Sequence, residues 1–157
     1  MTEPETREPQ PAAAPCIFCA IAAGQAPAIV VYEDEHTLAF MDINPATRGH
    51  VLVIPRRHAR DLLDVSEEDL QHVMRTVQRV ARAVDGALQP DGINLIQANR
   101  IAAFQSVYHF HVHVIPRWFG DGIAPPWRHA PGDPQVLQEL GAKIRTALAS
   151  QGSTAAS

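Results

Sequence analysis

Three short apolar runs in the first third of the chain are separated by breaks of polar residues, glycine or proline. They cover residues 28–34, 37–43 and 49–55, and each is rich in β-branched or aromatic residues. Runs of this length and composition are typical of β-strands, and the short breaks between them favour an antiparallel meander. Residues 16–24, just before the first run, have the composition of a short helix that stops at Gly24.

A longer pattern with helical periodicity follows the three strands. Its apolar residues recur every three or four positions, as expected for one face of a helix. They are Leu70, Val73, Met74, Val77, Val80, Ala81, Val84 and Leu88. Ser66 and Asp69 resemble a capping box at the start of this helix, and Pro90 and Gly92 close it.

The second half of the chain adds two strands and another helix. The apolar runs 93–98 and 106–116 predict the strands, and residues 133–150 predict the helix. Three strands, a helix, two strands and a helix make an α+β domain. With 157 residues, 46% of them hydrophobic, the chain suffices for one domain with its own core.

The ends and the net charge of the chain indicate its location in the cell and the kinds of partner it can bind. Residues 1–15 are rich in proline, alanine and glutamate, which predicts a disordered tail, and residues 151–157 are expected to fray. The N-terminus lacks the features of a signal peptide, and no apolar run approaches the ~20 residues that span a bilayer. We therefore expect a cytoplasmic protein with no membrane partner. A net charge of −4 argues against nucleic acid as a partner but permits a small anionic ligand.

Three of the eight histidines occupy alternate positions of the run "YHFHVHVIP". On a strand, His109, His111 and His113 would share one face. The opposite, core-facing side would carry Tyr108, Phe110, Val112 and Val114. Alternate Cα atoms on a strand are ~6.7 Å apart, so the outer two imidazoles are too distant to share an ion easily.

The histidine row leaves three interpretations open. Neighbouring imidazoles can chelate a metal ion. A neutral imidazole is also a nucleophile for phosphorus, with its neighbour as a cation or proton donor. The third interpretation is a set of structural histidines on a half-exposed strand. Gln105 and Ser106, and His50 and His58 of "RGHVLVIPRRH", offer further polar groups.

Cys16 and Cys19 are the only cysteines and form a C-x-x-C pair. A structural disulfide is not expected in a reducing compartment. Metal binding requires two further ligands. A redox site is expected to follow a strand, whereas a proline-rich tail precedes this pair. A pair without any ligand is the third possibility.

The sequence resembles the histidine triad (HIT) superfamily, and it is most similar to the histidine triad nucleotide-binding branch and its bacterial relatives. Four segments carry the resemblance: "CIFCAIAAG" with "VVYED", "LAFMDINPATRGHVLVIPRRH", the long helix with "GINLI", and "QSVYHFHVHVIPRWFGDG". They define a HIT domain over residues 16–120, with 121–150 as a C-terminal segment containing the second helix. The resemblance implies a five-stranded antiparallel sheet with a long helix and a C-terminal helix. It also implies a homodimer whose sheet continues across both subunits.

The resemblance further implies hydrolysis of a nucleoside phosphoramidate or a related purine nucleotide through a covalent nucleotidyl-histidine. His111 would attack the α-phosphorus, and water would then cleave the intermediate. His113 would hold a non-bridging phosphate oxygen, and His50 would fix the tautomers of the working histidines. Ser106 would provide the proton route to the departing amine.

Nucleotide-binding residues are implied by position. Asp42 in "FMDI" would accept hydrogen bonds from the ribose hydroxyls, and Gln105 would lie near the phosphate. Asn99 is a further candidate, although it lies one place beyond the asparagine of the family motif. The apolar residues that match the base pocket, and that are equally consistent with a core, are Ile17, Phe18, Ile21, Phe40 and Ile43.

Many bacterial relatives hold a structural zinc ion, and the resemblance implies one here. The ligands would be Cys16, Cys19, His58 and His109. Two thiolates and two imidazoles make a closed tetrahedral site with no open position for catalysis. The ion would tie the N-terminal segment to the sheet and leave the other two histidines of the row for the phosphate.

The family motif Asn-x-Gly-x-x-(Ala/Gly)-Gly-Gln is altered in this chain. Ala98 replaces the asparagine, and Arg100 and Phe104 replace the two glycines. Glycine at such positions permits unusual backbone angles or close approach to a phosphate. We therefore expect Phe104 to alter the loop or its contact with the ligand. Arg100 would offer a positive charge to an anionic substrate or face the solvent.

Other functions compete with the phosphoramidase. The segment "HVIPRW" is also similar to enzymes that cleave dinucleoside polyphosphates by hydrolysis or phosphorolysis. A non-catalytic nucleotide-binding or signalling module would keep Asp42 and the apolar pocket but would form no covalent adduct. A metalloenzyme centred on the histidine row would require His111 to bind the ion.

Overall fold

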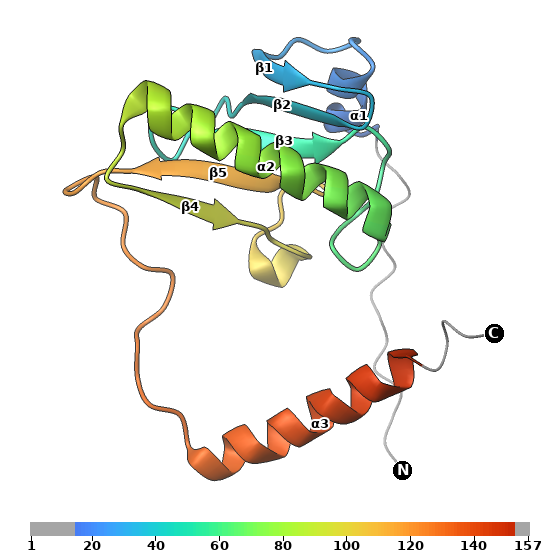
Figure 1. Ribbon diagram of the computed structural model, residues 1–157, viewed down its shortest axis with the longest axis vertical. Coiled ribbons are helices and arrows are strands. Elements are labelled where there is room, and N and C mark those ends of the chain that lie inside the picture. Colours follow the sequence, from blue (N-terminus) through green and yellow to red (C-terminus); the bar gives the residue numbers. More distant parts are fainter. Residues whose placement is uncertain (1–14, 153–157) are drawn as a thin grey trace. The chain divides into compact units, whose positions relative to one another are not determined.

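The structure is a computed structural model that describes residues 15–152 (Figure 1). The chain divides into two compact units, the first ending at Asp121 and the second beginning at Gly122. The expected tails fall almost entirely outside the described residues, which include only Pro15 of the first tail and Gln151 and Gly152 of the second. Between residues 15 and 152, no helix is both long and apolar enough to cross a membrane.

A five-stranded antiparallel sheet forms the first unit. Its strands are β1 (Val30–Glu33), β2 (Thr37–Met41), β3 (Val51–Pro55), β4 (Gly92–Ile96) and β5 (Val112–Arg117). Their order in the sheet is β1-β2-β3-β5-β4. The first three strands make the expected meander, and β4 pairs with β5 at the far edge. Strand β3 and nearly all of β2 are buried, in agreement with their continuous apolar runs.

Helix α2 (Glu67–Leu88) covers one face of this sheet (Figure 1). The core between them contains four helix residues, Val73, Val77, Val80 and Val84, and the sheet residues Ala39, Val51, Val53, Val112 and Val114. Burying a valine side chain contributes ~1.5–3 kcal/mol, so this layer is a main source of stability.

The ends and edges of α2 refine the expected pattern. Ser66 caps the helix because its Oγ accepts a hydrogen bond from the Asp69 N–H at 3.1 Å. The helix ends at Leu88, and its C-cap residue Gln89 adopts a left-handed conformation with φ 49°. Met74 and Leu88, expected in the core, are 43% and 39% exposed. Met74 lies a quarter turn away from the valine stripe and Leu88 lies in the last turn, so neither is fully covered by the sheet.

The opposite face of the sheet packs against α1 (Ile17–Ala22). Its apolar cluster contains Phe18 of α1 and Leu38, Phe40, Leu52 and Ile54 of the sheet. Cys16 caps α1, with its Sγ 3.4 Å from the Cys19 nitrogen, and Gly24 follows the helix at φ 71°. The short helix expected from the sequence is therefore present, with Cys16 as its N-cap and Cys19 within it.

Strand β5 begins later than the sequence pattern predicts. Residues 106–111 lie outside the regular strand, so within the histidine row only His113 belongs to β5. The Phe110 N–H donates to the carbonyl of Ala59 at 2.7 Å, which directs this stretch toward the loop after β3. The two faces nevertheless persist beyond the strand, because Phe110 joins the α2 core while the His111 ring contacts Phe18. Tyr108 was expected in the core, but it is 44% exposed.

The second unit contains helix α3 (Pro134–Gly152), which extends past the expected end at residue 150. Asp133 caps it by accepting a hydrogen bond from the Gln135 N–H at 2.8 Å. Among its described residues none is buried, and its exposed apolar residues include Leu137, Leu140, Ile144 and Leu148.

Candidate active site and metal site

His111 is held as a neutral imidazole with a defined tautomer. Its Nδ1 lies 2.7 Å from the carbonyl oxygen of His109, and a carbonyl can only accept, so Nδ1 carries the proton. The lone pair is therefore on Nε2. The side chain is buried, and burial lowers the pKa of His111, which keeps the ring uncharged at neutral pH. A neutral imidazole with a free Nε2 lone pair is a competent nucleophile.

A relay of hydrogen bonds places the proton of the neighbouring His113. The Ala46 N–H donates to Nδ1 of His50 at 3.0 Å, so neutral His50 carries its proton on Nε2. That Nε2 lies 2.8 Å from Nδ1 of His113 and donates to it. The proton of His113 is consequently on its own Nε2. The His111 and His113 rings lie 4.9 Å apart, so a nucleophilic nitrogen and an N–H donor are neighbours.

Burial keeps the relay neutral. It lowers the pKa of His50, and together with the nearby His111 and His50 it lowers the pKa of His113 to about 4. The carboxylate of Asp42 opposes both shifts from the end of β2. Its Oδ2 lies 3.5 Å from Nε2 of His50 and 4.0 Å from Nδ1 of His113, and its Oδ1 accepts from the Asn44 N–H at 2.8 Å. Asp42 thus lies beside His50 and His113, and its expected contact with ribose hydroxyls stays a prediction.

The close approach of His50 and His113 indicates a hydrogen bond rather than two ligands of one metal ion. Asp42, His50 and His113 have ligand atoms within 4.8 Å of one another, which could suggest three ligands of one ion. Two nitrogens bound to one tetrahedral zinc lie ~3.3 Å apart. The nitrogens of His50 and His113 are only 2.8 Å apart, which is a hydrogen-bond distance.

A second cluster brings together the four residues expected to bind zinc. Nδ1 of His109 lies 3.4 Å from Sγ of Cys16, 3.4 Å from Sγ of Cys19 and 3.3 Å from Nδ1 of His58. All four potential ligand atoms lie within 4.8 Å of one another. Bond lengths of ~2.0 Å to nitrogen and ~2.3 Å to sulfur place the ligands of a tetrahedral zinc ~3.3–3.8 Å apart. The spacing and the donor set therefore fit such an ion.

The protonation states of this cluster also fit a metal. Nε2 of His109 lies 2.8 Å from the carbonyl of Pro55 and donates to it, so Nδ1 keeps its lone pair for the cluster. Burial lowers the pKa of His109 to about 4, which keeps the ring neutral. Burial and the neighbouring Cys16 raise the pKa of Cys19 to about 11. An ion that binds here must therefore displace the thiol proton.

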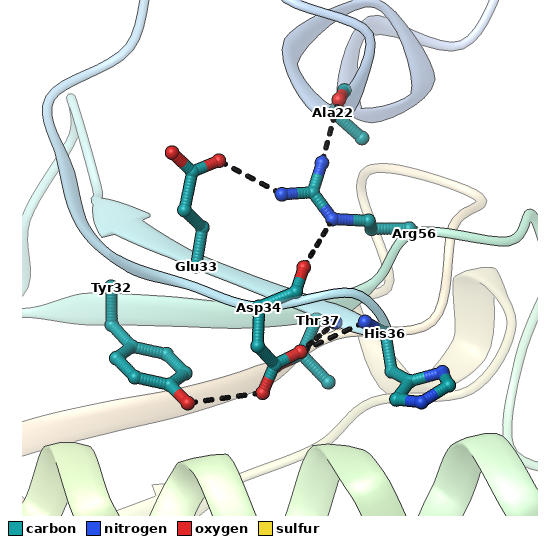
Figure 2. A network of polar contacts seen from close by, with 7 residues as sticks. All are labelled: Ala22, Tyr32, Glu33, Asp34, His36, Thr37 and Arg56. Atoms are coloured by element: carbon teal, nitrogen blue, oxygen red, sulfur yellow. Dashed lines mark hydrogen bonds and ion pairs between the residues drawn. The ribbon is translucent and has the colours of Figure 1, made fainter.

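Arg56 anchors the helix that supplies both cysteines (Figure 2). Its guanidinium donates to the carbonyl of Ala22 at 3.0 Å, to the carbonyl of Asp34 at 2.6 Å and to the carboxylate of Glu33 at 2.8 Å. Ala22 is the last residue of α1, so these bonds tie α1 to the turn between β1 and β2. Arg56 was not among the residues predicted for the site, and its place two residues before His58 is the signal that could have indicated it.

The apolar residues expected around the base divide by exposure. Phe18 and Phe40 are buried, with their ring centroids 5.3 Å apart, and the Phe18 ring lies 5.2 Å from that of His111. Ile21 packs against the same cluster, whereas Ile17 and Ile43 are 50% and 87% exposed. Phe18 therefore supports the histidines from the core, whereas Ile17 and Ile43 belong to the surface.

The polar residues before the histidine row take different roles. The Gln105 side chain accepts from the Arg100 N–H at 2.7 Å and donates to the carbonyls of Arg60 and Val107. Asn99 accepts from the Leu62 N–H at 2.8 Å and donates to the side chain of Gln97. Both amides are thus committed to the loops around the site. Ser106, expected at the leaving group, is exposed.

Several known proteins are similar to this chain in sequence and in fold. A family model for the HIT domain matches residues 23–120. Protein hit of Bacillus subtilis is 42% identical over 138 residues, which are 86% of this chain and 95% of that protein. The adenosine 5'-monophosphoramidase of Schizosaccharomyces pombe is 34% identical over 134 residues, with 85% and 98% covered. A zinc-bound histidine triad family protein from Mycobacterium smegmatis, seen in a crystal structure, has a TM-score of 0.67 and 44% identity, with 89% and 97% covered. The chain therefore belongs to the HIT family and has its fold.

Proposed function

We propose that this protein hydrolyses nucleoside phosphoramidates, of the adenosine type, through a covalent nucleotidyl-histidine on His111. The observation that carries the proposal is the hydrogen bond from Nδ1 of His111 to the His109 carbonyl, which leaves Nε2 as the nucleophilic nitrogen. The name of the S. pombe relative, an adenosine 5'-monophosphoramidase, supports the substrate class.

In the first step, Nε2 of His111 attacks the α-phosphorus. The new N–P bond forms as the bond from phosphorus to the leaving amine breaks, and the electron pair of that bond goes to the amine. Ser106, which is exposed, relays a proton from solvent to the amine, which departs neutral. The imidazole becomes positively charged, and its Nδ1–H stays bonded to the His109 carbonyl at 2.7 Å, which stabilises that charge.

In the second step, water attacks the same phosphorus. The N–P bond breaks, its electron pair returns to Nε2 of His111, and the nucleoside monophosphate leaves while one water proton passes to solvent. His113 donates its Nε2–H to a non-bridging oxygen in both steps, because His50 holds the tautomer that presents this proton. Asp42, which follows the last residue of β2, accepts hydrogen bonds from the ribose hydroxyls.

We further propose that Cys16, Cys19, His58 and His109 hold a zinc ion. The geometry and donor set described above support this, and a zinc-bound family member has been seen in a crystal structure. The ion would act structurally, since four protein ligands complete its tetrahedron. It would fix α1 and the peptide of His109 relative to the sheet.

The homodimer implied by the resemblance is also proposed for this chain. Strand β4 forms one edge of the sheet, and Leu95 and Ile96 on it are 49% and 46% exposed. An apolar edge strand is a template for pairing with another strand. Sedimentation should therefore give twice the 17.1 kDa mass of the chain. Leu95→Lys should shift the protein to the monomer, because lysine on an edge blocks pairing.

The mechanism is tested with adenosine 5'-phosphoramidate as the probe. His111→Ala should reduce turnover by at least about a thousandfold while binding of adenosine monophosphate persists. His72→Ala is the matched control, because this histidine on α2 stacks on His36 with centroids 3.8 Å apart, outside the site. Mass spectrometry of quenched enzyme should find the nucleotidyl adduct on His111. Unchanged turnover of His111→Ala, or an adduct on another residue, would overturn the proposal.

The same assays separate the competing functions. A dinucleoside polyphosphate enzyme would turn over diadenosine tetraphosphate faster than the phosphoramidate, and a phosphorylase would require inorganic phosphate. A pure nucleotide-binding module would bind adenosine monophosphate but show neither turnover nor an adduct. A metalloenzyme centred on the histidine row would lose its bound metal in His111→Ala.

A further inference from the structure

The loop between β4 and β5 holds two side-chain-bearing residues in conformations that favour glycine. Arg100 has φ 70° and ψ 168°, a region that is almost exclusive to glycine, and Phe104 has φ 66° and ψ 25°. These are the two positions at which the family motif carries glycine. The expectation that Phe104 alters the loop is therefore refined, because the backbone keeps angles suited to glycine and the difference lies in the side chains.

The fold enforces this strain through Gln105. Its buried side-chain oxygen accepts from the Arg100 N–H at 2.7 Å, and its amide group donates to the carbonyl of Arg60 at 2.7 Å. The Gln105 N–H also returns to the Arg100 carbonyl at 3.1 Å, and the Phe104 N–H donates to Ile101 at 2.9 Å. The turn is thus closed from both sides, which prevents its backbone from relaxing.

Packing within the described part of the chain does not explain why a phenylalanine stands at position 104. Phe104 is 91% exposed, and Ile101 in the same turn (η1, Ile101–Ala103) is 78% exposed. A strained backbone that presents an exposed aromatic ring is costly for stability. Such strain is retained where it serves function.

The sheet register places the end of β4, which precedes this turn in the chain, beside His113. Phe40 pairs with Leu52, Leu52 with His113, and His113 with Ile96, so the four side chains form one row across β2, β3, β5 and β4. Directly paired residues of an antiparallel sheet share a face. One end of this row lies on β2, where Phe40 and Asp42 are the residues proposed to bind the nucleoside. The other end is Ile96 of β4, which is half exposed, and Figure 1 shows η1 beyond the arrowhead of β4.

We propose that Phe104 is a specificity-determining residue that, with Ile96, binds an apolar and preferably aromatic leaving group of the substrate. This inference rests on the proposed function. The nucleoside occupies the β2 side of His113, so the group expelled from phosphorus extends toward β4 and the strained turn. An aromatic ring there can stack on a leaving group that carries its own ring, and ammonia gains nothing from it.

The test uses two adenosine phosphoramidates that differ only in the amine, ammonia in one and phenethylamine in the other. Phe104→Ala removes the ring but keeps a side chain at positive φ, whereas Phe104→Gly also relieves the backbone. Both variants should lower kcat/KM for the phenethylamine substrate about three- to tenfold and leave the ammonia substrate within about twofold. Only Phe104→Gly should raise the melting temperature above that of the wild type, by a few degrees.

Controls separate this inference from its alternatives. Phe119→Ala removes a ring that is 93% exposed beyond the other end of β5, and its selectivity should match the wild type. An unchanged ratio of the two substrates in both Phe104 variants overturns the inference. A change of sedimentation in those variants also overturns it, because the ring would then belong to a subunit interface. Failure of the wild type on both phosphoramidates, by contrast, refutes the proposed function itself.

Discussion

The carbonyl of His109 accepts a hydrogen bond from Nδ1 of His111 at 2.7 Å. The imidazole of His109 belongs to the thiol cluster, which is made of Cys16, Cys19, His58 and His109, and its Nδ1 lies 3.4 Å from the sulfur of each cysteine. One residue therefore joins the proposed metal site to the proposed nucleophile through its own backbone. Its Nε2 is fixed in turn by the carbonyl of Pro55 at 2.8 Å. An ion that immobilises the His109 side chain also immobilises the carbonyl that sets the tautomer of His111.

Removing a metal ligand should therefore weaken both stability and catalysis. His58→Ala deletes an exposed ligand, so we expect bound zinc to fall, the melting temperature to drop by several degrees and kcat to fall about ten- to a hundredfold. Elemental analysis, thermal unfolding and steady-state kinetics measure the three effects. His72→Ala, on α2, should change none of them. A His58→Ala protein that keeps its zinc content would contradict the ligand assignment.

Thr47 is expected to position the relay without touching substrate. Its hydroxyl donates to the carbonyl of Pro116 in β5 at 2.6 Å, and the adjacent Ala46 N–H donates to Nδ1 of His50 at 3.0 Å. Thr47→Val loses this anchor, so the N–H that fixes the His50 tautomer moves. We expect kcat to fall about tenfold, with Thr47→Ser close to the wild type.

Nitrogen NMR of the histidine rings distinguishes this role from a general loss of packing. In Thr47→Val the proton of His50 should divide between Nδ1 and Nε2, whereas the wild type should show a single tautomer protonated on Nε2. A variant with reduced kcat but an unchanged His50 tautomer would show that Thr47 acts by another route.

The sequence pattern was informative where local apolar composition controls structure. The three strands of the meander, the valine stripe of α2 and the helix between Cys16 and Gly24 were all predicted from spacing and composition. The start of β5 was not, because a bond between Phe110 and Ala59 directs residues 106–111 away from regular pairing. Alternation of side chains survives this departure, so the histidines still gather on one face.

The site was predictable in its side chains but not in its backbone groups. The resemblance gave the four candidate metal ligands, and the structure places them together. The proton positions depend on the Ala46 N–H and on the carbonyls of Pro55 and His109, and no residue type signals such backbone contacts. The positive φ of Phe104 was signalled only by the glycine of the family motif, because this chain carries phenylalanine at that position.

Acid should destabilise the fold through His113. Its pKa is lowered to about 4 from an ordinary value of 6.5, so between these values the unfolded chain binds a proton that the folded chain excludes. The contribution of neutral His113 to the free energy of unfolding is therefore fully present above pH 7. It is lost as the pH decreases from 6.5 to 4, which lowers the free energy of unfolding by up to about 3 kcal/mol. His113→Asn cannot take up this proton, so its urea unfolding free energy should fall less over the same range. Parallel curves for the two proteins would contradict this account, and comparing them also cancels acid effects at the thiol cluster.

Arg56 should contribute more to the free energy of unfolding than its exposed ion pair alone would. Its bond to Glu33 lies at the surface, where the Glu33 side chain is 63% exposed, and such a pair contributes ~0–1 kcal/mol. Its bonds to the carbonyls of Ala22 and Asp34 hold α1, and charged hydrogen bonds of this kind contribute ~1.5–3 kcal/mol. Arg56→Gln should thus lower the unfolding free energy by about 1–3 kcal/mol and weaken zinc retention against a chelator. Glu33→Gln, which removes only the ion pair, should change stability by less than about 0.5 kcal/mol. Equal effects of the two substitutions, measured by urea unfolding, would mean that the α1 anchor contributes nothing.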